Sequence, residues 1–149
     1  WHSIVLIPLL MVQAVGGGLS LMLILVQVPG VSGPAVGELL APAAIMIATS
    51  GILIAAHLCT RRLAGVSGRA AVRPLVAGEY RGLFIFGAFL CGIIVPLALI
   101  ALVQLGVYVA ALAAMAAVFQ LTGVLLFKYC LLNAGAYSKL YSERLLGTR

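Results

Sequence analysis

Apolar stretches long enough to cross a lipid bilayer recur along the whole chain, and this feature limits the fold more than any other. A transmembrane helix needs about 20 predominantly apolar residues. Helices suit the bilayer because they satisfy every backbone polar group internally. Four such stretches occupy residues 4–28, 36–58, 83–105 and 108–132. The sequence therefore predicts an all-α membrane protein whose residues 1–132 form a bundle of four transmembrane helices.

The composition excludes a water-soluble domain of this size. Of the 149 residues, 64% are hydrophobic and only 8% are charged, so charged side chains are too few to cover a soluble surface. The connections between the stretches are too short to bury a core of their own, so chemistry in water would require partner subunits. We expect no cleaved signal peptide, because the first stretch is too long and too apolar and lacks a cleavage site.

The basic residues predict the orientation of the bundle. All nine Lys and Arg residues fall in the loop after the second stretch, in the C-terminal tail, or at the adjoining helix ends. In an antiparallel bundle these segments lie on one side of the membrane together with the N-terminus. By the positive-inside rule both termini are cytoplasmic, and we expect a prokaryotic inner membrane. Since the charge marks topology, the net charge of +6 does not indicate a nucleic-acid partner.

Turn and packing signals agree with such a bundle. Residues 104–108 form a short connection that predicts an antiparallel helical hairpin. Ala88 and Gly92 are small residues four apart, a spacing that lets helices approach closely in lipid. Pro96 predicts a kink or a local loosening of its span. Residues 133–149 are predicted to be a cytoplasmic tail, either a short interfacial helix or a flexible segment.

Ionisable residues inside membrane spans are functional candidates because burying a charge in lipid is costly. None lies in the middle of a predicted span. His57, near the cytoplasmic end of the second span, could exchange a proton or a hydrogen bond with a quinone carbonyl, or be a polar helix end at the headgroups. Glu79, at the cytoplasmic entry to the third span, could admit protons or pair with arginines of the preceding loop. A bis-histidine haem with His2 is not favoured, since His2 lies at the edge of its span.

Neutral polar residues form a second set of candidates. Gln13 and Gln120, together with Thr122, could line a proton path through ordered water. They could instead bridge helices by hydrogen bonds, which in membrane proteins contribute about 0.6 kcal/mol on average. We favour the bridging role for these side chains.

The cysteines and the missing motifs exclude several classes of protein. Cys59, Cys91 and Cys130 lie on three different spans, with no metal or redox spacing between them, so membrane-packed free thiols are expected. No dinucleotide fingerprint, phosphate loop or zinc-spaced cluster occurs. The sequence therefore predicts no metal ligand and no directly bound cofactor. A proton-coupled transporter would need a carboxylate deep in a span, and no predicted span contains one.

Three stretches carry a family resemblance. They are residues 1–18, opening with Trp1-His2-Ser3-Ile4; residues 75–99, with Gly78-Glu79-Tyr80, Leu83-Phe84, Gly92 and Pro96; and residues 123–135, from Gly123 to Gly135. These stretches resemble, in order, the start of the second helical bundle, the next-to-last helix and the final helix of NrfD-type proteins. Members of that family are the membrane subunits of polysulfide, nitrite and related molybdenum or cytochrome reductases.

The resemblance implies a role in electron transport. Members exchange electrons between the quinone pool and an iron–sulfur subunit, which passes them to or from a catalytic reductase or dehydrogenase subunit. The likeness covers only about the last half of a typical member, whose quinone pocket is associated with the first bundle, so it assigns no quinone ligand here. It implies a membrane-anchor or quinone-interacting subunit of a respiratory oxidoreductase, or its C-terminal half. The residues leave two alternatives: a non-catalytic assembly subunit and a small transporter component.

Overall fold

The computed structural model describes residues 5–30, 33, 35–63, 78, 81–106 and 109–146, with the backbone alone at 61–63, 109 and 134–146. Every regular element in these ranges is helical: α1 (Leu6–Leu25), α2 (Val36–Leu63), η1 (Leu83–Ile94), α4 (Val95–Gln104) and α5 (Val109–Leu146). Four helical spans are long and apolar enough to cross a membrane: Leu6–Leu25, Val36–Thr60, Leu83–Gln104 and Ala110–Asn133. The predictions of an all-helical chain and of four membrane-length helices are confirmed, and by length and composition the chain is an integral membrane protein.

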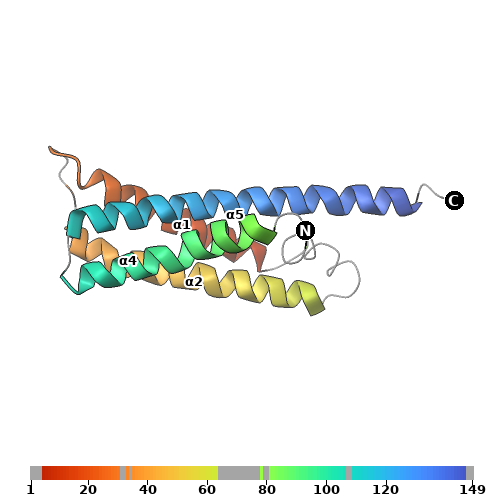
Figure 1. The fold of residues 1–149 in the computed structure, drawn as a ribbon, viewed down its shortest axis with the longest axis horizontal. Coiled ribbons are helices and arrows are strands. Elements are labelled where there is room, and N and C mark those ends of the chain that lie inside the picture. The colour runs from red at the N-terminus through yellow and green to blue at the C-terminus, as the bar shows by residue number, and fades with distance from the viewer. Residues whose placement is uncertain are drawn as a thin grey trace.

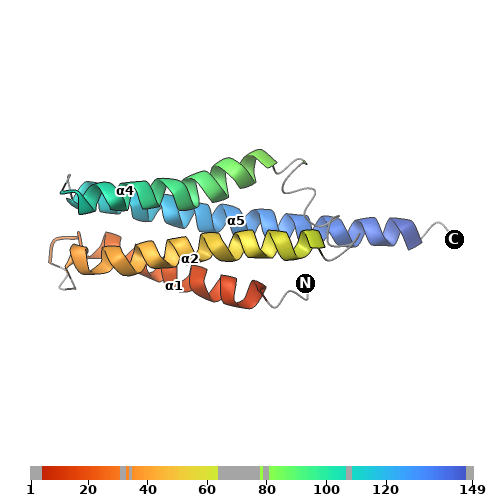
Figure 2. The same ribbon diagram turned by 90° about the horizontal axis from the view of Figure 1, so that it is seen from below.

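The four spans lie side by side in one bundle (Figures 1 and 2). The C-terminal end of α1 and the N-terminal end of α2 lie at the same end of the bundle as the turn between α4 and α5. In that turn Gly106 has a φ of 86°, a left-handed conformation that glycine adopts without steric cost. Its N–H donates to the Val103 carbonyl at 3.0 Å.

The C-terminal tail continues the last span. Its backbone is a direct extension of α5 as far as Leu146. In both ribbon views this extension projects beyond the other helices (Figures 1 and 2). At about 1.5 Å per residue, residues 134–146 add roughly 20 Å of helix past the span.

The third span is wound in two ways. Its first part, η1, is a π-helix of 12 residues, and its second part, α4, is α-helical. At the junction the Val95 N–H donates to the carbonyl of Leu90, five residues earlier. The next residue, Pro96, has no N–H, so an α-helix there would leave the Gly92 carbonyl without its usual donor. The change of winding is a local loosening of the kind that Pro96 predicts, although π segments are usually only one turn long.

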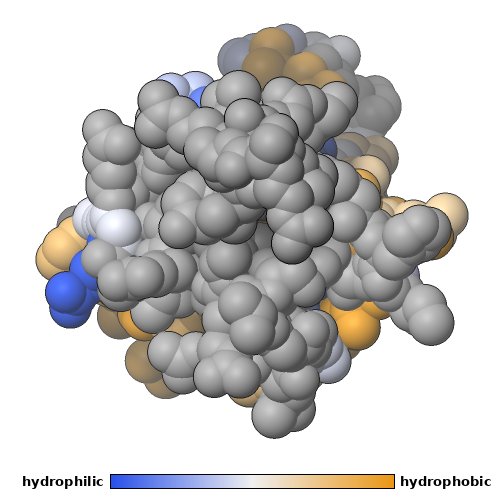
Figure 3. Space-filling view, turned by 90° about the vertical axis from the view of Figure 1, so that its right-hand side faces the viewer, coloured by the Kyte–Doolittle hydropathy of each residue, from blue (hydrophilic) through white to orange (hydrophobic). Residues whose placement is uncertain are grey.

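Large apolar side chains cover the outside of the spans. Ile7, Met11, Ile52, Phe86 and Leu125 each expose about two thirds of their surface, from 65 to 69%. In the view along the bundle, hydrophobic atoms of the described residues are visible at the rim (Figure 3). A water-soluble monomer seldom exposes so much apolar area, whereas lipid tails solvate it readily.

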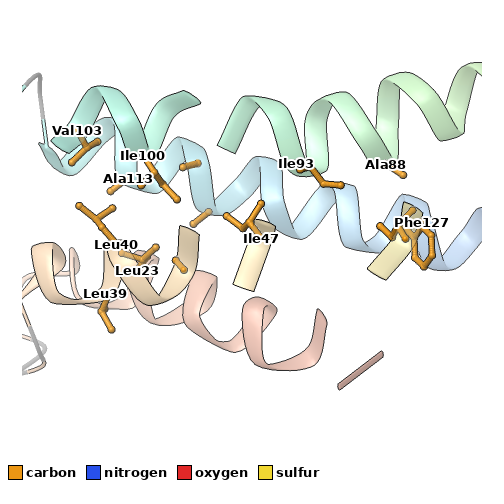
Figure 4. Packing of buried hydrophobic residues seen from close by; sticks show 14 of the residues in the cluster. Leu23, Leu39, Leu40, Ile47, Ala88, Ile93, Ile100, Val103, Ala113 and Phe127 are labelled. Atoms are coloured by element: carbon orange, nitrogen blue, oxygen red, sulfur yellow. The ribbon is translucent and has the colours of Figure 1, made fainter. Parts of the chain in front are cut away.

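Inside the bundle, buried apolar side chains from all four spans meet along the axis (Figure 4). Leu23, Leu40 and Ala113 lie toward the end that holds the α4–α5 turn, and Phe127 lies toward the other end. The Phe127 ring packs against Phe84 with centroids 6.2 Å apart and planes tilted by 45°. This separation lies within the range of stabilising aromatic pairs.

The closest helix approach joins η1 to α5. A Cβ placed on Gly92 would lie 2.8 Å from the Cα of Gly123, and one placed on Gly87 would lie 2.6 Å from Leu126 Cδ1. A side chain at position 92 would collide with the Gly123 backbone, whereas one at position 87 would displace only the end of the Leu126 side chain. Gly92, one of the small residues predicted to bring helices together, therefore does so here. Since Gly87 is opposite Leu126 and Gly92 is opposite Gly123, these two helices run in opposite directions.

Candidate functional site

Two of the candidate polar residues, Gln13 on α1 and Gln120 on α5, are buried within the bundle. They expose 2% and 1% of their surface, respectively. The Oε1 atom of each is fully buried and accepts no hydrogen bond from any described residue. A buried acceptor left without a donor costs about 1–3 kcal/mol. Such atoms in a native structure call for a physical explanation.

Gly16 is the point at which α1 meets its neighbours. A Cβ placed on Gly16 would lie 3.5 Å from the Nε2 atom of Gln120 and 3.5 Å from the Cβ of Met46 on α2. These are ordinary van der Waals distances, so the Gln120 amide lies against the buried face of α1 at Gly16.

Gln13 lies on the same face of α1 as Gly16. The buried positions of this helix are Leu9, Gln13, Gly16, Ser20 and Leu23. They are spaced alternately four and three residues apart, which places them along one side of a helix. Gln13 is thus one turn from the contact between Gly16 and Gln120.

Two buried serines complete the polar interior. The Ser20 hydroxyl donates to the Gly16 carbonyl, and the Ser50 hydroxyl donates to the Ile47 carbonyl, each at 3.0 Å. Because each hydroxyl hydrogen is used within its own helix, the two side chains offer only oxygen lone pairs to the surrounding groups. We call Gln13, Ser20, Ser50 and Gln120 the central polar cluster.

The register of α1 and α2 places Ser50 at the depth of Gln13 along the bundle axis. Met46 lies against Gly16, and the two helices run in opposite directions along the bundle (Figure 2). One turn further along α2 is Ser50, and one turn back along α1 is Gln13. Each step moves about 5 Å along the axis in the same direction, so the two side chains lie at about the same depth.

The remaining candidate residues lie apart from this cluster. His57 is buried at 7% exposure, seven residues or about 10 Å along α2 from Ser50, and its carbonyl accepts a hydrogen bond from Thr60 Oγ1 at 3.0 Å. Thr122 is exposed on α5 and donates to the Val118 carbonyl at 2.9 Å, so it does not join the two glutamines. Glu79 and His2 lie outside the described residues.

Sequence reasoning missed the roles of Gly16 and Ser50. In the sequence alone the Gly16-Gly17-Gly18 run predicts only a small-residue packing face, and Ser50 is one of several neutral polar residues in the spans. The spacing of Gln13, Gly16 and Ser20 on one helical face was the available signal.

No metal site joins these groups. Among the described residues, no group of three or more His, Cys, Asp or Glu side chains is placed to hold a metal ion.

The three cysteines differ in exposure: Cys59 is exposed, Cys91 is partly buried and Cys130 is buried.

Comparisons of the chain with protein-family models, with curated proteins and with solved structures found no match. The resemblance to the NrfD family therefore stays a hypothesis.

Proposed function

We propose that the chain is a membrane-anchor subunit, or the C-terminal half of one, in a quinone-linked respiratory oxidoreductase complex of the NrfD type. One observation carries the proposal. Phe84 packs against Phe127, and Gly92 packs against Gly123. The first residue of each pair belongs to the stretch that resembles the family's next-to-last helix, and the second belongs to the stretch that resembles its final helix. The positions behind the family likeness are thus positions that hold two helices together.

The topology that goes with this proposal is an antiparallel bundle in a prokaryotic inner membrane, with both termini in the cytoplasm. Arg81 precedes the third span and Lys128 lies near the end of the fourth, so both belong to the end of the bundle from which α5 projects. The positive-inside rule assigns that end to the cytoplasm.

In such a complex this bundle would hold partner subunits at the membrane. The proposed partners are an iron–sulfur subunit and a catalytic subunit, which would carry the metal centres of the electron path. The exposed apolar side chains of the spans supply area for partner helices as well as for lipid. His57, buried near the proposed cytoplasmic end, is the described residue best placed to contact a quinone carbonyl or a proton there. Glu79 is proposed as a second proton contact.

Gentle extraction from the native membrane, followed by mass spectrometry and quinone analysis, tests this function. We expect an iron–sulfur subunit, a molybdenum or cytochrome partner, and quinone in the purified complex. Gly92→Leu should disrupt the η1–α5 contact and reduce recovery of the partners, whereas Gly18→Ala should not, because a Cβ at Gly18 meets nothing within 4 Å. A stable 15.4 kDa chain that purifies with neither redox partners nor quinone would overturn the proposal.

A non-catalytic assembly subunit of another kind of complex is the second candidate. It is favoured by the character of the interior, where the buried ionisable side chains among the described residues are His57 and Cys130. Recovery of partner proteins that contain no redox centre would support this candidate over the first. A transporter component is less favoured, because buried apolar side chains lie on both sides of the central polar cluster.

A further inference from the structure

The two unpaired amide oxygens of the central polar cluster define a binding site that does not depend on the proposed function. We propose that Gln13 and Gln120 together hold an internal water molecule, which donates to both Oε1 atoms and bridges α1 to α5 at Gly16. The site is closed to both membrane surfaces.

The chemistry of the cluster selects a donor as the occupant. Both glutamine Oε1 atoms lack a donor, and the Ser20 and Ser50 hydroxyl hydrogens are already bonded to carbonyls of their own helices. The glutamine and serine oxygens of the cluster are therefore acceptors that still need a donor, and the two amide Nε2 groups can donate to the same occupant. A water molecule supplies two hydrogens and typically makes about three hydrogen bonds when buried in a protein. A cation would find only neutral ligands in the cluster, and a charge in the membrane interior without a counter-charge is costly.

The geometry at Gly16 places the site between two helices. The Gln120 amide nitrogen lies 3.5 Å from where a Gly16 Cβ would be, so the amide of Gln120 is held against the buried face of α1. Gln13 lies on that face one turn away. A bridging water would let the two amides meet their hydrogen-bonding needs without a direct bond between them.

Apolar layers close the site along the bundle axis. Toward the α4–α5 turn lie Leu23, Leu40 and Ala113, and toward the other end lie Leu9 and Phe127. Figure 4 shows four of these side chains, with Leu23, Leu40 and Ala113 grouped at one end and Phe127 at the other. Water held between such layers is isolated, so it links helices and does not conduct protons.

Solid-state NMR of the protein in lipid bilayers tests the site directly. The chain contains four glutamines, Gln13, Gln27, Gln104 and Gln120, so labelling glutamine with ¹⁵N gives a small set of side-chain amide signals. Polarisation transfer from water protons is measured with and without a gadolinium chelate in the aqueous phase. We expect Gln13 and Gln120 to receive transfer that survives the chelate. The exposed Gln104 should lose its transfer when the chelate is added.

The contrary outcomes of this measurement are distinct. Absence of transfer to Gln13 and Gln120 would show that the site holds no water. A coupling across a hydrogen bond between their two amides would show a direct contact in place of water. Quenching of their transfer by the chelate, as at Gln104, would show a site open to bulk solvent. Each of these results overturns the proposal.

Substitution tests whether the water is shared. Gln120→Leu should abolish the water transfer to Gln13, and Gln13→Leu should abolish the transfer to Gln120, whereas the control Gln104→Leu should leave both unchanged. Full transfer to Gln13 in Gln120→Leu would refute a shared water. If a variant does not fold, the wild-type spectra with and without the chelate still test the proposed water site.

Proton permeability tests the closure of the site. Liposomes containing the wild-type protein should leak protons no faster than empty liposomes. A flux that Gln120→Leu removes would contradict a closed site.

Discussion

Gly92 on η1 and Gly123 on α5 bring two helix backbones into contact in the interior of the bundle. A Cβ placed on Gly92 would lie 2.8 Å from the Gly123 Cα, closer than real Cβ atoms come to other atoms. In a bilayer no hydrophobic effect drives helices together, so close backbone packing supplies much of their attraction. The contact also fixes the register that places Phe84 against Phe127.

We expect Gly92→Ala to lower the free energy of unfolding by about 1–3 kcal/mol, the usual cost of forcing extra volume into a packed interior. Denaturation by SDS from mixed micelles measures the change. Gly18→Ala is the matched control, since a Cβ there meets nothing within 4 Å, and it should be neutral or stabilising by up to about 1 kcal/mol. Equal stability of the two variants would show that the contact between Gly92 and Gly123 contributes nothing to the free energy of unfolding.

Truncation of Phe127 tests the aromatic pair. Phe→Ala changes in soluble cores cost about 3–5 kcal/mol. We expect the cost of Phe127→Ala to fall at the lower end of this range, because lipid solvates the Phe127 ring when the bundle comes apart. Phe86→Ala, at a residue that is 65% exposed, should cost far less. A double-mutant cycle with Phe84→Ala should give a coupling of about 0.5–1.5 kcal/mol. Additive single effects would argue against a specific contact between the rings.

Labelling of Cys59 tests the proposed orientation. Cys59 is exposed near the C-terminal end of the second span, whereas Cys130 is buried. A membrane-impermeant maleimide should therefore label Cys59 in inverted vesicles and not in intact spheroplasts. In a Cys59→Ser background, Ala35→Cys at the other end of the bundle should show the opposite pattern. Labelling of Cys59 from outside spheroplasts would reverse the topology.

The spans could be predicted because the length and the local composition of a stretch decide whether it can cross a bilayer. The first stretch expected at residues 4–28 contains α1, and the fourth, expected at residues 108–132, differs by one or two residues from the span Ala110–Asn133. By contrast, the π winding of η1 was not predictable. Pro96 marks a missing hydrogen-bond donor, but it does not say how the preceding backbone finds other partners.

The site was predictable only as separate residues. Gln13 and Gln120 stand out as polar residues in apolar sequence, yet the contact of Gln120 with the α1 face that carries Gln13 depends on how α1 is rotated about its axis relative to α5. In a soluble protein the apolar stripe of an amphipathic helix sets this rotation. Here α1 is apolar on its exposed side as well, with Ile7 and Met11 facing outward. The rotation is therefore decided by small residues and polar contacts that involve other helices.

Replacement of Pro96 tests whether this proline determines the winding of the third span. Pro in a helix interior costs about 3 kcal/mol relative to Ala, so Pro→Ala normally stabilises a helix. We expect Pro42→Ala in α2 to do so, since Pro42 lies inside an α-helix and is exposed. Pro96→Ala should instead give no gain or a loss. The new N–H at position 96 can bond to the Gly92 carbonyl, which favours α winding and turns Gly92 away from Gly123.

The readouts for the two proline variants are the free energy of unfolding and amide hydrogen exchange across residues 90–97. In Pro96→Ala we expect altered exchange at Val95, whose N–H donates to the Leu90 carbonyl in the π pattern, because α winding would move this bond to the Cys91 carbonyl. Stabilisation of similar size in both variants, with unchanged exchange at Val95, would show that packing against α5 imposes the π winding. The proline would then be tolerated in η1–α4 without directing its shape.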